Sequence, residues 1–176
     1  LVINQSKYLT IVRTGKKVGI CGNNGCRVFN ITGNSGYAYE IKGITIKEGT
    51  ADNGGGLYAN MTSDSYIYIR NCKFTDNSVI NFGSANGGAV YINEGGDFED
   101  CSFFKNTSEN FGGGVCAMKN ASFTNCSFFE NVSYYGAGAY AVNGSFSNCI
   151  FDKNLSWSHA GGLYLKTSNA TNCLFT

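Results

Sequence analysis

Apolar and polar residues alternate along this chain over short stretches of four to six residues. No window places apolar residues at helical spacing for three turns. Alternation with a period of two is typical of short β-strands that bury one face and expose the other. The pattern therefore predicts a chain built from many short strands, without helices.

Six of these segments can be aligned with one another, and their first residues lie 23 to 29 positions apart. They are Ile41–Ile46, Ile69–Phe74, Phe98–Phe103, Phe123–Phe128, Phe146–Phe151 and Ala170–Phe175. A repeat of this length indicates a stacked architecture in which each unit contacts only its neighbours.

A second half of the repeat follows five of the segments, as a run of small residues that opens another strand. The runs are Gly54–Tyr58, Gly87–Tyr91, Gly112–Cys116, Gly136–Tyr140 and Ala160–Tyr164. Between the two halves lies the motif Phe-x-x-Asn, which ends at Asn77, Asn106, Asn131 and Asn154. Each unit thus contains a strand, a corner, a loop and another strand.

Two aligned columns predict the corners. The column before each cysteine holds Gly43, Asn71, Asp100, Asn125, Asn148 and Asn172. These residue types tolerate positive φ, so we expect one left-handed residue per coil there. The Phe-x-x-Asn column, with Gly49 as its first member, supports the same argument for a second corner. Its stacked amides would form a hydrogen-bonded ladder.

Apolar columns between the corners would form a continuous core once the coils stack, roughly 4.8 Å apart. We therefore predict a right-handed parallel β-helix of six to seven coils, each about 24 residues long, as a repeat solenoid. The whole chain, residues 1–176, is expected to form a single domain. It would be a fragment or repeating subunit of a larger assembly.

Phe-x-x-Asn alternating with Gly-Gly-Ala-x-Tyr resembles the polymorphic outer membrane protein repeat, first recognised in chlamydial surface adhesins. The N-terminal stretches Val18–Ile20 and Arg27–Ile31 look like the broader β-helix class. The resemblance covers roughly residues 16–176. It implies a cell-surface or secreted protein that is often adhesive, and it carries no information on catalysis.

Composition narrows the function classes. The net charge is +1 with acids and bases scattered, which gives no footprint for nucleic acid. No apolar stretch is long enough to span a membrane. Neither end carries a polar cap, so we expect end-to-end stacking into a fibre. The strand near Cys173 and Phe175 would then meet the strand around Lys7 to Val12 of the next copy.

Eight cysteines are present. Cys21 and Cys26 flank a Gly-Asn-Asn-Gly turn, which leaves two alternatives open, a local disulfide or two ordinary thiols. Five others share one inward column, for which we favour a ladder of small core thiols over disulfides. This column contains Cys72, Cys101, Cys126, Cys149 and Cys173.

The glycosylation motif Asn-x-Ser/Thr occurs ten times. Random placement of 22 Asn against 28 Ser and Thr would give about 3.5. The excess predicts a glycosylated extracellular protein, although repeat duplication also creates motifs. The better candidates are Asn4, Asn30, Asn60, Asn120, Asn143 and Asn169. The weaker candidates, which occupy corner columns, are Asn106, Asn125, Asn131 and Asn154.

A row of tyrosines is expected on the outer face of one sheet. If Leu57, Val90, Val115, Ala139 and Leu163 face inward, their neighbours Tyr58, Tyr91, Tyr140 and Tyr164 face outward, with Cys116 among them. Beside them we expect a smooth strip of Gly and Ala. Stacking alone could explain the row. Alternatively, it is a binding face for sugars or proteins.

The acids offer little support for catalysis. Polysaccharide-cleaving β-helices need either clustered carboxylates that hold Ca²⁺ beside a basic residue or an acid pair at a defined separation. The densest group here, Glu94, Asp97, Glu99 and Asp100, lies in one segment without matching acids on neighbouring coils. His159 is expected to be a loop residue. No zinc or phosphate-binding motif appears.

The sequence thus favours an extracellular, glycosylated structural or adhesive β-helix without a cofactor beyond its N-glycans. Its expected partners are further copies of itself, other cell-surface proteins or carbohydrate. A carbohydrate-binding module that uses the tyrosine row is the first alternative. A polysaccharide lyase or hydrolase is the second.

Overall fold

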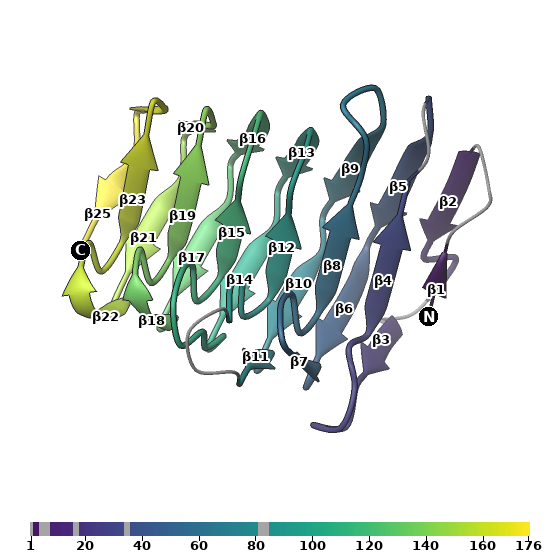
Figure 1. The fold of residues 1–176 in the computed structure, drawn as a ribbon, viewed down its shortest axis with the longest axis horizontal. Helices are drawn as coiled ribbons and strands as arrows, with labels where there is room; N and C mark the ends of the chain where they lie inside the picture. Colours follow the sequence, from purple (N-terminus) through teal and green to yellow (C-terminus); the bar gives the residue numbers. More distant parts are fainter. Residues whose placement is uncertain (1, 4–7, 16–17, 34–35, 81–84) are drawn as a thin grey trace.

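The computed structural model describes residues 2–3, 8–15, 18–33, 36–80 and 85–176, and within them every regular element is a β-strand. The strands form an elongated stack of coils, with the two ends of the chain at opposite ends of its long axis (Figure 1). Three long sheets run along this axis, and all of the strand pairs are parallel.

Each long sheet contains seven strands. The first sheet contains β1 (Val2–Ile3), β4 (Phe29–Thr32), β8 (Leu57–Asn60), β12 (Val90–Ile92), β15 (Val115–Ala117), β19 (Ala139–Val142) and β23 (Leu163–Lys166). The second contains β2 (Tyr8–Val12), β5 (Ala38–Lys42), β9 (Tyr66–Arg70), β13 (Gly96–Glu99), β16 (Ala121–Thr124), β20 (Ser145–Ser147) and β24 (Asn169–Thr171).

The third sheet contains β3 (Val18–Cys21), β6 (Ile44–Lys47), β10 (Lys73–Thr75), β14 (Ser102–Phe104), β17 (Ser127–Phe129), β21 (Ile150–Asp152) and β25 (Leu174–Phe175). Two short pairs lie in the loops between the third sheet and the first. They are β7 (Thr50–Ala51) with β11 (Ser78–Val79), and β18 (Val132–Tyr135) with β22 (Leu155–His159).

Each coil contributes one strand to every long sheet, and the chain makes about six turns with a repeat of about 26 residues. The register matches the aligned columns, since Phe74 pairs with Phe103 and Phe103 with Phe128. The predicted parallel β-helix is therefore confirmed.

The core consists of phenylalanine rings stacked from coil to coil. Rings of Phe74, Phe103, Phe128 and Phe151 follow one another at centroid distances of 5.1, 4.8 and 4.6 Å. A second stack joins Phe98, Phe123 and Phe146 at 4.7 and 4.6 Å. These side chains are at most 1% exposed, so each coil buries its apolar face only against its neighbours.

The first predicted corner is confirmed. Every residue of the column before the cysteines has positive φ, between 50° at Asn71 and 74° at Gly43. The prediction for the second corner is wrong by one residue. Positive φ occurs one residue before each member of the predicted column, at Glu48, Asp76, Lys105, Glu130 and Lys153.

The reason for this shift is the direction of the asparagine side chains. A left-handed residue at Lys105 (φ 54°) turns the chain so that its own charged side chain is exposed and Asn106 points into the core. There the predicted amide ladder is confirmed. Nδ2 of Asn77 donates to Oδ1 of Asn106 (3.0 Å), Asn106 to Asn131 (3.0 Å) and Asn131 to Asn154 (2.9 Å).

Candidate functional site

The tyrosine row lies on the outer face of the first sheet. Leu57, Val90, Val115 and Ala139 are fully buried, and their neighbours in β8, β12 and β19 are half-buried tyrosines. The rings form two pairs. Tyr58 and Tyr91 stack at 5.3 Å with 12° between their planes, and Tyr140 and Tyr164 at 5.2 Å with 18°.

Burial raises the pKa of Tyr91 and that of Tyr140 above the ordinary value of 10.0. Both phenols therefore stay protonated in neutral solution. Each ring thus offers an apolar face together with a hydroxyl group that can donate a hydrogen bond. This combination suits stacking against a sugar or a protein side chain.

Cys116 interrupts the row between the two pairs. It is fully buried, its Sγ lies 3.7 Å from the Sδ of Met118, and burial raises the pKa of its thiol. The Phe111 ring, from the loop before β15, lies 4.5 Å from the Tyr140 ring. An aromatic side chain from outside the row thus lies beside the C-terminal pair.

Phe111 begins a second aromatic row that the sequence reasoning missed. Its ring lies 5.2 Å from Tyr135, which stacks on His159 at 5.5 Å and meets the edge of Tyr164 at 6.3 Å. All three residues directly precede the small-residue runs, so aligning that position would have revealed them. The aromatic surface is therefore two rows wide over the C-terminal coils.

Exposed aromatic residues border this second row. Tyr134 is 43% exposed, and its ring centroid lies 4.8 Å from that of Tyr135. Trp157 of β22 is 57% exposed. At the other end of the tyrosine row, the Arg27 guanidinium lies 4.8 Å above the Tyr58 ring. Its Nε and Nη2 donate to the carbonyl of Asn53 at 3.1 and 2.9 Å. We call Tyr58, Tyr91, Phe111, Tyr135, Tyr140, His159 and Tyr164 the aromatic face.

The predicted strip of smooth Gly and Ala beside the tyrosines is wrong, because these residues are packed inside. A Cβ at Gly138 would lie 2.8 Å from the Phe151 ring and 3.3 Å from the Asn154 amide. A Cβ at Gly114 would lie 3.3 Å from Phe128 and 3.4 Å from Asn131. A Cβ would also clash with the Gly162 carbonyl oxygen at Gly138 and with the Gly138 carbonyl oxygen at Gly114. These positions are therefore small because the backbone of the next coil, the phenylalanine stack and the amide ladder fill the space around them.

The acids of the candidate catalytic segment are engaged in contacts between coils. Arg70 of β9 lies between three carboxylates, with Nη1 3.4 Å from Glu40, Nη2 3.6 Å from Asp97 and Nε 3.2 Å from Glu99. Glu40 lies one coil before Arg70 and therefore two coils before Asp97 and Glu99. Glu94 pairs with Lys119 at 3.4 Å.

Two of these acids also accept hydrogen bonds from the following coil. Asp97 accepts a 2.7 Å hydrogen bond from Ser122, and Asp100 has φ of 54° and accepts one from Asn125 at 3.3 Å. His159 lies in β22, rather than in a loop, and contacts Ser158 at 2.5 Å. Within the described residues, no group of three or more acids, histidines and cysteines could hold a metal.

The cysteine column consists of free thiols, as favoured from the sequence. Each thiol donates to a backbone carbonyl of the preceding coil, as Cys101 does to Ile69 at 3.3 Å. Burial raises the pKa of Cys72 to about 12. Hydrogen bonds with the neighbouring thiols of Cys101 and Cys149, together with burial, raise that of Cys126.

The two N-terminal cysteines are separate thiols in the structure. Cys21 lies 3.0 Å from the Glu48 carboxylate, and Cys26 donates to the carbonyl of Gly22 at 3.5 Å. Of the two alternatives, the structure therefore has the free thiols, because each sulfur has turned to a different acceptor.

In the charged corner column, Lys105 forms an ion pair with Glu130 of the next coil at 3.7 Å. Lys153 lies nearer to its own neighbour Asp152, at 3.9 Å. The left-handed turn projects these side chains into solvent, where each can pair either with a neighbour in sequence or with a residue of the next coil.

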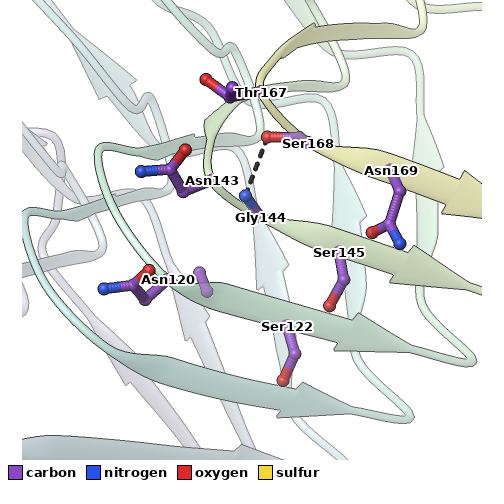
Figure 2. Close-up of a pocket in the computed structure, with 9 residues that line it drawn as sticks. Asn120, Ser122, Asn143, Gly144, Ser145, Thr167, Ser168 and Asn169 are labelled. Carbon is purple, nitrogen blue, oxygen red and sulfur yellow. Dashed lines mark hydrogen bonds between the residues drawn. The ribbon is translucent and has the colours of Figure 1, made fainter.

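A shallow groove follows the corner between the first and second sheets (Figure 2). It has a volume of about 490 Å³ and is lined by uncharged residues alone, namely Asn120, Ala121, Ser122, Asn143, Gly144, Ser145, Thr167, Ser168 and Asn169. Asn120, Asn143 and Thr167 stack at the turn, each with positive φ of 51° or 52°. The groove contains three of the predicted glycosylation asparagines.

The remaining glycosylation candidates lie in several environments. Asn60 is exposed at the end of β8, and Asn30 is half-buried in β4 beside Tyr58. Asn125 is exposed at the corner before Cys126. Asn106 and Asn131 are fully buried in the amide ladder, which Asn154 ends. Asn4 lies outside the described residues.

Comparison with known proteins identifies the repeat. Residues 100–118 match the family model of the Chlamydia polymorphic membrane protein repeat. No curated protein and no solved structure shows significant similarity to this chain. The chain thus carries a repeat of this kind within a parallel β-helix, which suggests a surface protein of structural or adhesin-like character. The described residues contain no helix long and apolar enough to cross a membrane.

Proposed function

We propose that this chain is an extracellular, N-glycosylated β-helix that acts as an adhesive scaffold and binds its partners through the aromatic face. The repeat match supports a cell-surface location. The observation that carries the proposal is the extent of the aromatic face, which covers two rows and includes both stacked tyrosine pairs. Aromatic residues are enriched where proteins bind one another and where they bind sugars.

The most direct test compares cell binding by purified wild-type chain and by the double variant Tyr91→Ser/Tyr140→Ser. Both tyrosines project from the first sheet, so their loss should abolish binding without unfolding the chain. Tyr68→Ser is the matched control, because Tyr68 is also half-buried but lies on the second sheet. Equal binding by the double variant and wild type would refute the role of the aromatic face.

Carbohydrate is the second candidate ligand, because each stacked tyrosine offers an apolar ring face together with a hydroxyl group. A sugar ring presents C–H groups to an aromatic face and hydroxyls to its edge. Treating the target cells with glycosidases should then abolish binding of the wild-type chain. Binding that survives glycosidase but not protease would assign the aromatic face to a protein partner.

We also propose association along the axis. In the last coil Phe175 is 52% exposed, although it continues the buried column of Phe151, whereas Leu174 lies in the outward-facing column of Ile150. A further coil, from a second copy or from more of the same polypeptide, would cover Phe175. Sedimentation velocity should show assemblies that grow with concentration, and Leu174→Lys/Phe175→Lys should prevent them. A wild-type chain that stays monomeric at every concentration contradicts self-stacking.

In this proposal the acids around Arg70 serve stability, and the chain works without catalysis or a cofactor other than covalent glycans. Pairing with Arg70 and Lys119 supports this assignment. The chain should therefore leave an acidic polysaccharide intact in the presence of Ca²⁺. Cleavage that is lost in Asp97→Ala and Asp100→Ala would instead establish the enzyme alternative.

A further inference from the structure

The ten glycosylation motifs are equivalent in sequence, but the structure separates their asparagines by what the amide nitrogen already does. An N-linked glycan is attached to Nδ2, which then keeps a single hydrogen. An acceptor asparagine in the folded protein must therefore have an exposed Nδ2, and it must be able to give up one N–H donor.

Asn106 and Asn131 of the ladder fail both requirements, and Asn154 at its half-buried end donates its Nδ2 to the carbonyl of Phe128 at 2.9 Å. Nδ2 of Asn106 uses its two hydrogens, one for the carbonyl of Phe74 at 3.1 Å and one for Asn131 at 3.0 Å. Nδ2 of Asn131 likewise donates to Phe103 at 3.0 Å and to Asn154 at 2.9 Å. Both side chains are 0% exposed. A sugar on either nitrogen would break the ladder and require space inside the core.

Two further candidates are partly engaged, and a third is partly enclosed. Nδ2 of Asn120 donates to Glu94 at 3.1 Å, and Nδ2 of Asn125 donates to Asp100 at 3.3 Å. Asn30 lies half-buried beside Tyr58, and its Oδ1 is enclosed without a partner in the described structure. A glycan at these positions would compete with existing contacts.

Asn60, Asn143 and Asn169 are exposed, and their side chains make no hydrogen bond within the described residues. Asn143 and Asn169 come from neighbouring coils and line the groove of about 490 Å³ (Figure 2). The groove lining is uncharged and rich in hydroxyl and amide groups, which can hydrogen bond to a sugar. This groove provides room for the first sugar residues.

We propose that Asn60, Asn143 and Asn169 are the described positions that carry N-linked glycans, whereas Asn106, Asn131 and Asn154 are structural and carry none. This inference rests on the proposed secretory origin of the chain. In the modification, Nδ2 forms a bond to the anomeric carbon of an oligosaccharide linked to a lipid pyrophosphate. The bond between that carbon and the pyrophosphate oxygen breaks, the lipid pyrophosphate leaves, and Nδ2 loses one proton.

The test is to secrete the full chain from a eukaryotic cell line behind a heterologous signal sequence and to isolate the folded monomer or assembly. Enzymatic deglycosylation in heavy-oxygen water converts each occupied Asn to a labelled Asp, and peptide mass spectrometry then locates the label. We expect label at Asn60, Asn143 and Asn169, and none at the three ladder positions.

Two variants keep the test independent of folding defects. Asn143→Gln removes the acceptor, and Ser145→Ala removes the motif but keeps the asparagine; both residues are exposed. On an electrophoresis gel, each variant should migrate faster than the wild-type chain by the shift that one glycan causes. Label on Asn106, Asn131 or Asn154 in folded protein overturns the assignment, and so does an absence of label at the three exposed positions.

The outcome is separable from that of the adhesion proposal. Cell binding can be measured on enzymatically deglycosylated chain, because the aromatic face contains none of the three asparagines. Retained binding without occupied sites would leave the adhesive function standing and remove the glycan assignment alone.

Discussion

Asn106 and Asn143 are the same residue type, each lies at a corner of a coil, and each begins the motif Asn-x-Ser. They nevertheless have opposite roles. Asn106 is fully buried and holds three coils together, because its amide contacts Asn77, Asn131 and the Phe74 carbonyl. Asn143 is exposed at the edge of the groove. The comparison teaches that a corner asparagine becomes structural or available according to the direction of its side chain.

A shift of one residue in the turn causes this difference. At Asn143 the asparagine itself is left-handed, with φ of 51°, and its side chain projects outward. At the ladder corner the left-handed residue is Lys105, so the next residue points inward. The left-handed position therefore decides which side chain of a corner reaches solvent.

The largest expected effect comes from placing a carboxylate in the amide ladder, and the same substitution at the groove turn serves as its comparison. Asn106→Asp removes both amide donors and buries a charge against the carbonyl oxygens of Phe74 and Asn131. We expect the free energy of unfolding to fall by at least about 3 kcal/mol. Asn143→Asp keeps a residue that tolerates positive φ and should change it by less than about 0.5 kcal/mol.

Urea unfolding followed by circular dichroism measures both variants. If Asn106→Asp fails to fold, Asn154→Asp at the half-buried end of the ladder provides an intermediate case. Equal stability of the Asn106 and Asn143 variants would contradict the distinction between the columns.

Buried and exposed cysteines should likewise differ in how they make the stability of the fold depend on pH. The pKa of Cys72 is raised from 9.0 to about 12 in the fold, so the unfolded chain loses this proton first. The stability that this thiol contributes is complete below pH 9 and falls as pH rises toward 12, by about 1.4 kcal/mol per pH unit. Cys72→Ala should remove that slope.

The measurement is the free energy of unfolding at several alkaline pH values for wild type and Cys72→Ala. Cys21→Ala, which removes an exposed thiol, is the matched control. An unchanged slope in Cys72→Ala would show that burial of the column does not disfavour its thiolates.

The groove column allows a gain in stability. Thr167 occupies the position of Asn120 and Asn143 on the last coil and has φ of 52°, which is unfavourable for a β-branched residue. Thr167→Asn should raise the free energy of unfolding by about 1 kcal/mol. Asn143→Thr is the reverse change and should lower it by a similar amount. Thermal unfolding that shows no change in either variant would rule out strain at this turn.

The smallest effect on stability is expected for the exposed charged residues that directly precede the ladder asparagines. Lys105 and Glu130 lie 3.7 Å apart, with side chains 52% and 44% exposed. Glu130→Gln should therefore cost less than about 0.5 kcal/mol, and the difference should vanish at high salt. A larger, salt-independent loss would mean that the exposed column contributes as the buried one does.

Much of the fold could be predicted because each coil repeats the same local choices. The Phe and Cys columns, the left-handed residue before each cysteine and the amide ladder all follow from aligning the repeats, and the structure confirms them. Alignment could not place the second left-handed residue. Charged Lys105 is an uncommon choice at positive φ, and Asn106 is a common one, so residue preference pointed to the wrong position.

The candidate sites were less accessible from sequence. The tyrosine row was found because it repeats one residue type. Phe111, Tyr135 and His159 share the position before the small-residue runs but differ in residue type, so their row was recognised from their stacking. Likewise, Glu40 is far along the chain from Asp97 and Glu99, and the three carboxylates meet only around Arg70.

By itself, the sequence determined the coil length, the apolar columns and hence the parallel β-helix, because these depend on a period repeated many times. Only the tertiary structure decided which asparagines are buried, which acids are paired and where the aromatic rows join. Each of those outcomes depends on the direction of one side chain toward the neighbouring coil, and a shift of one residue in a turn reverses that direction.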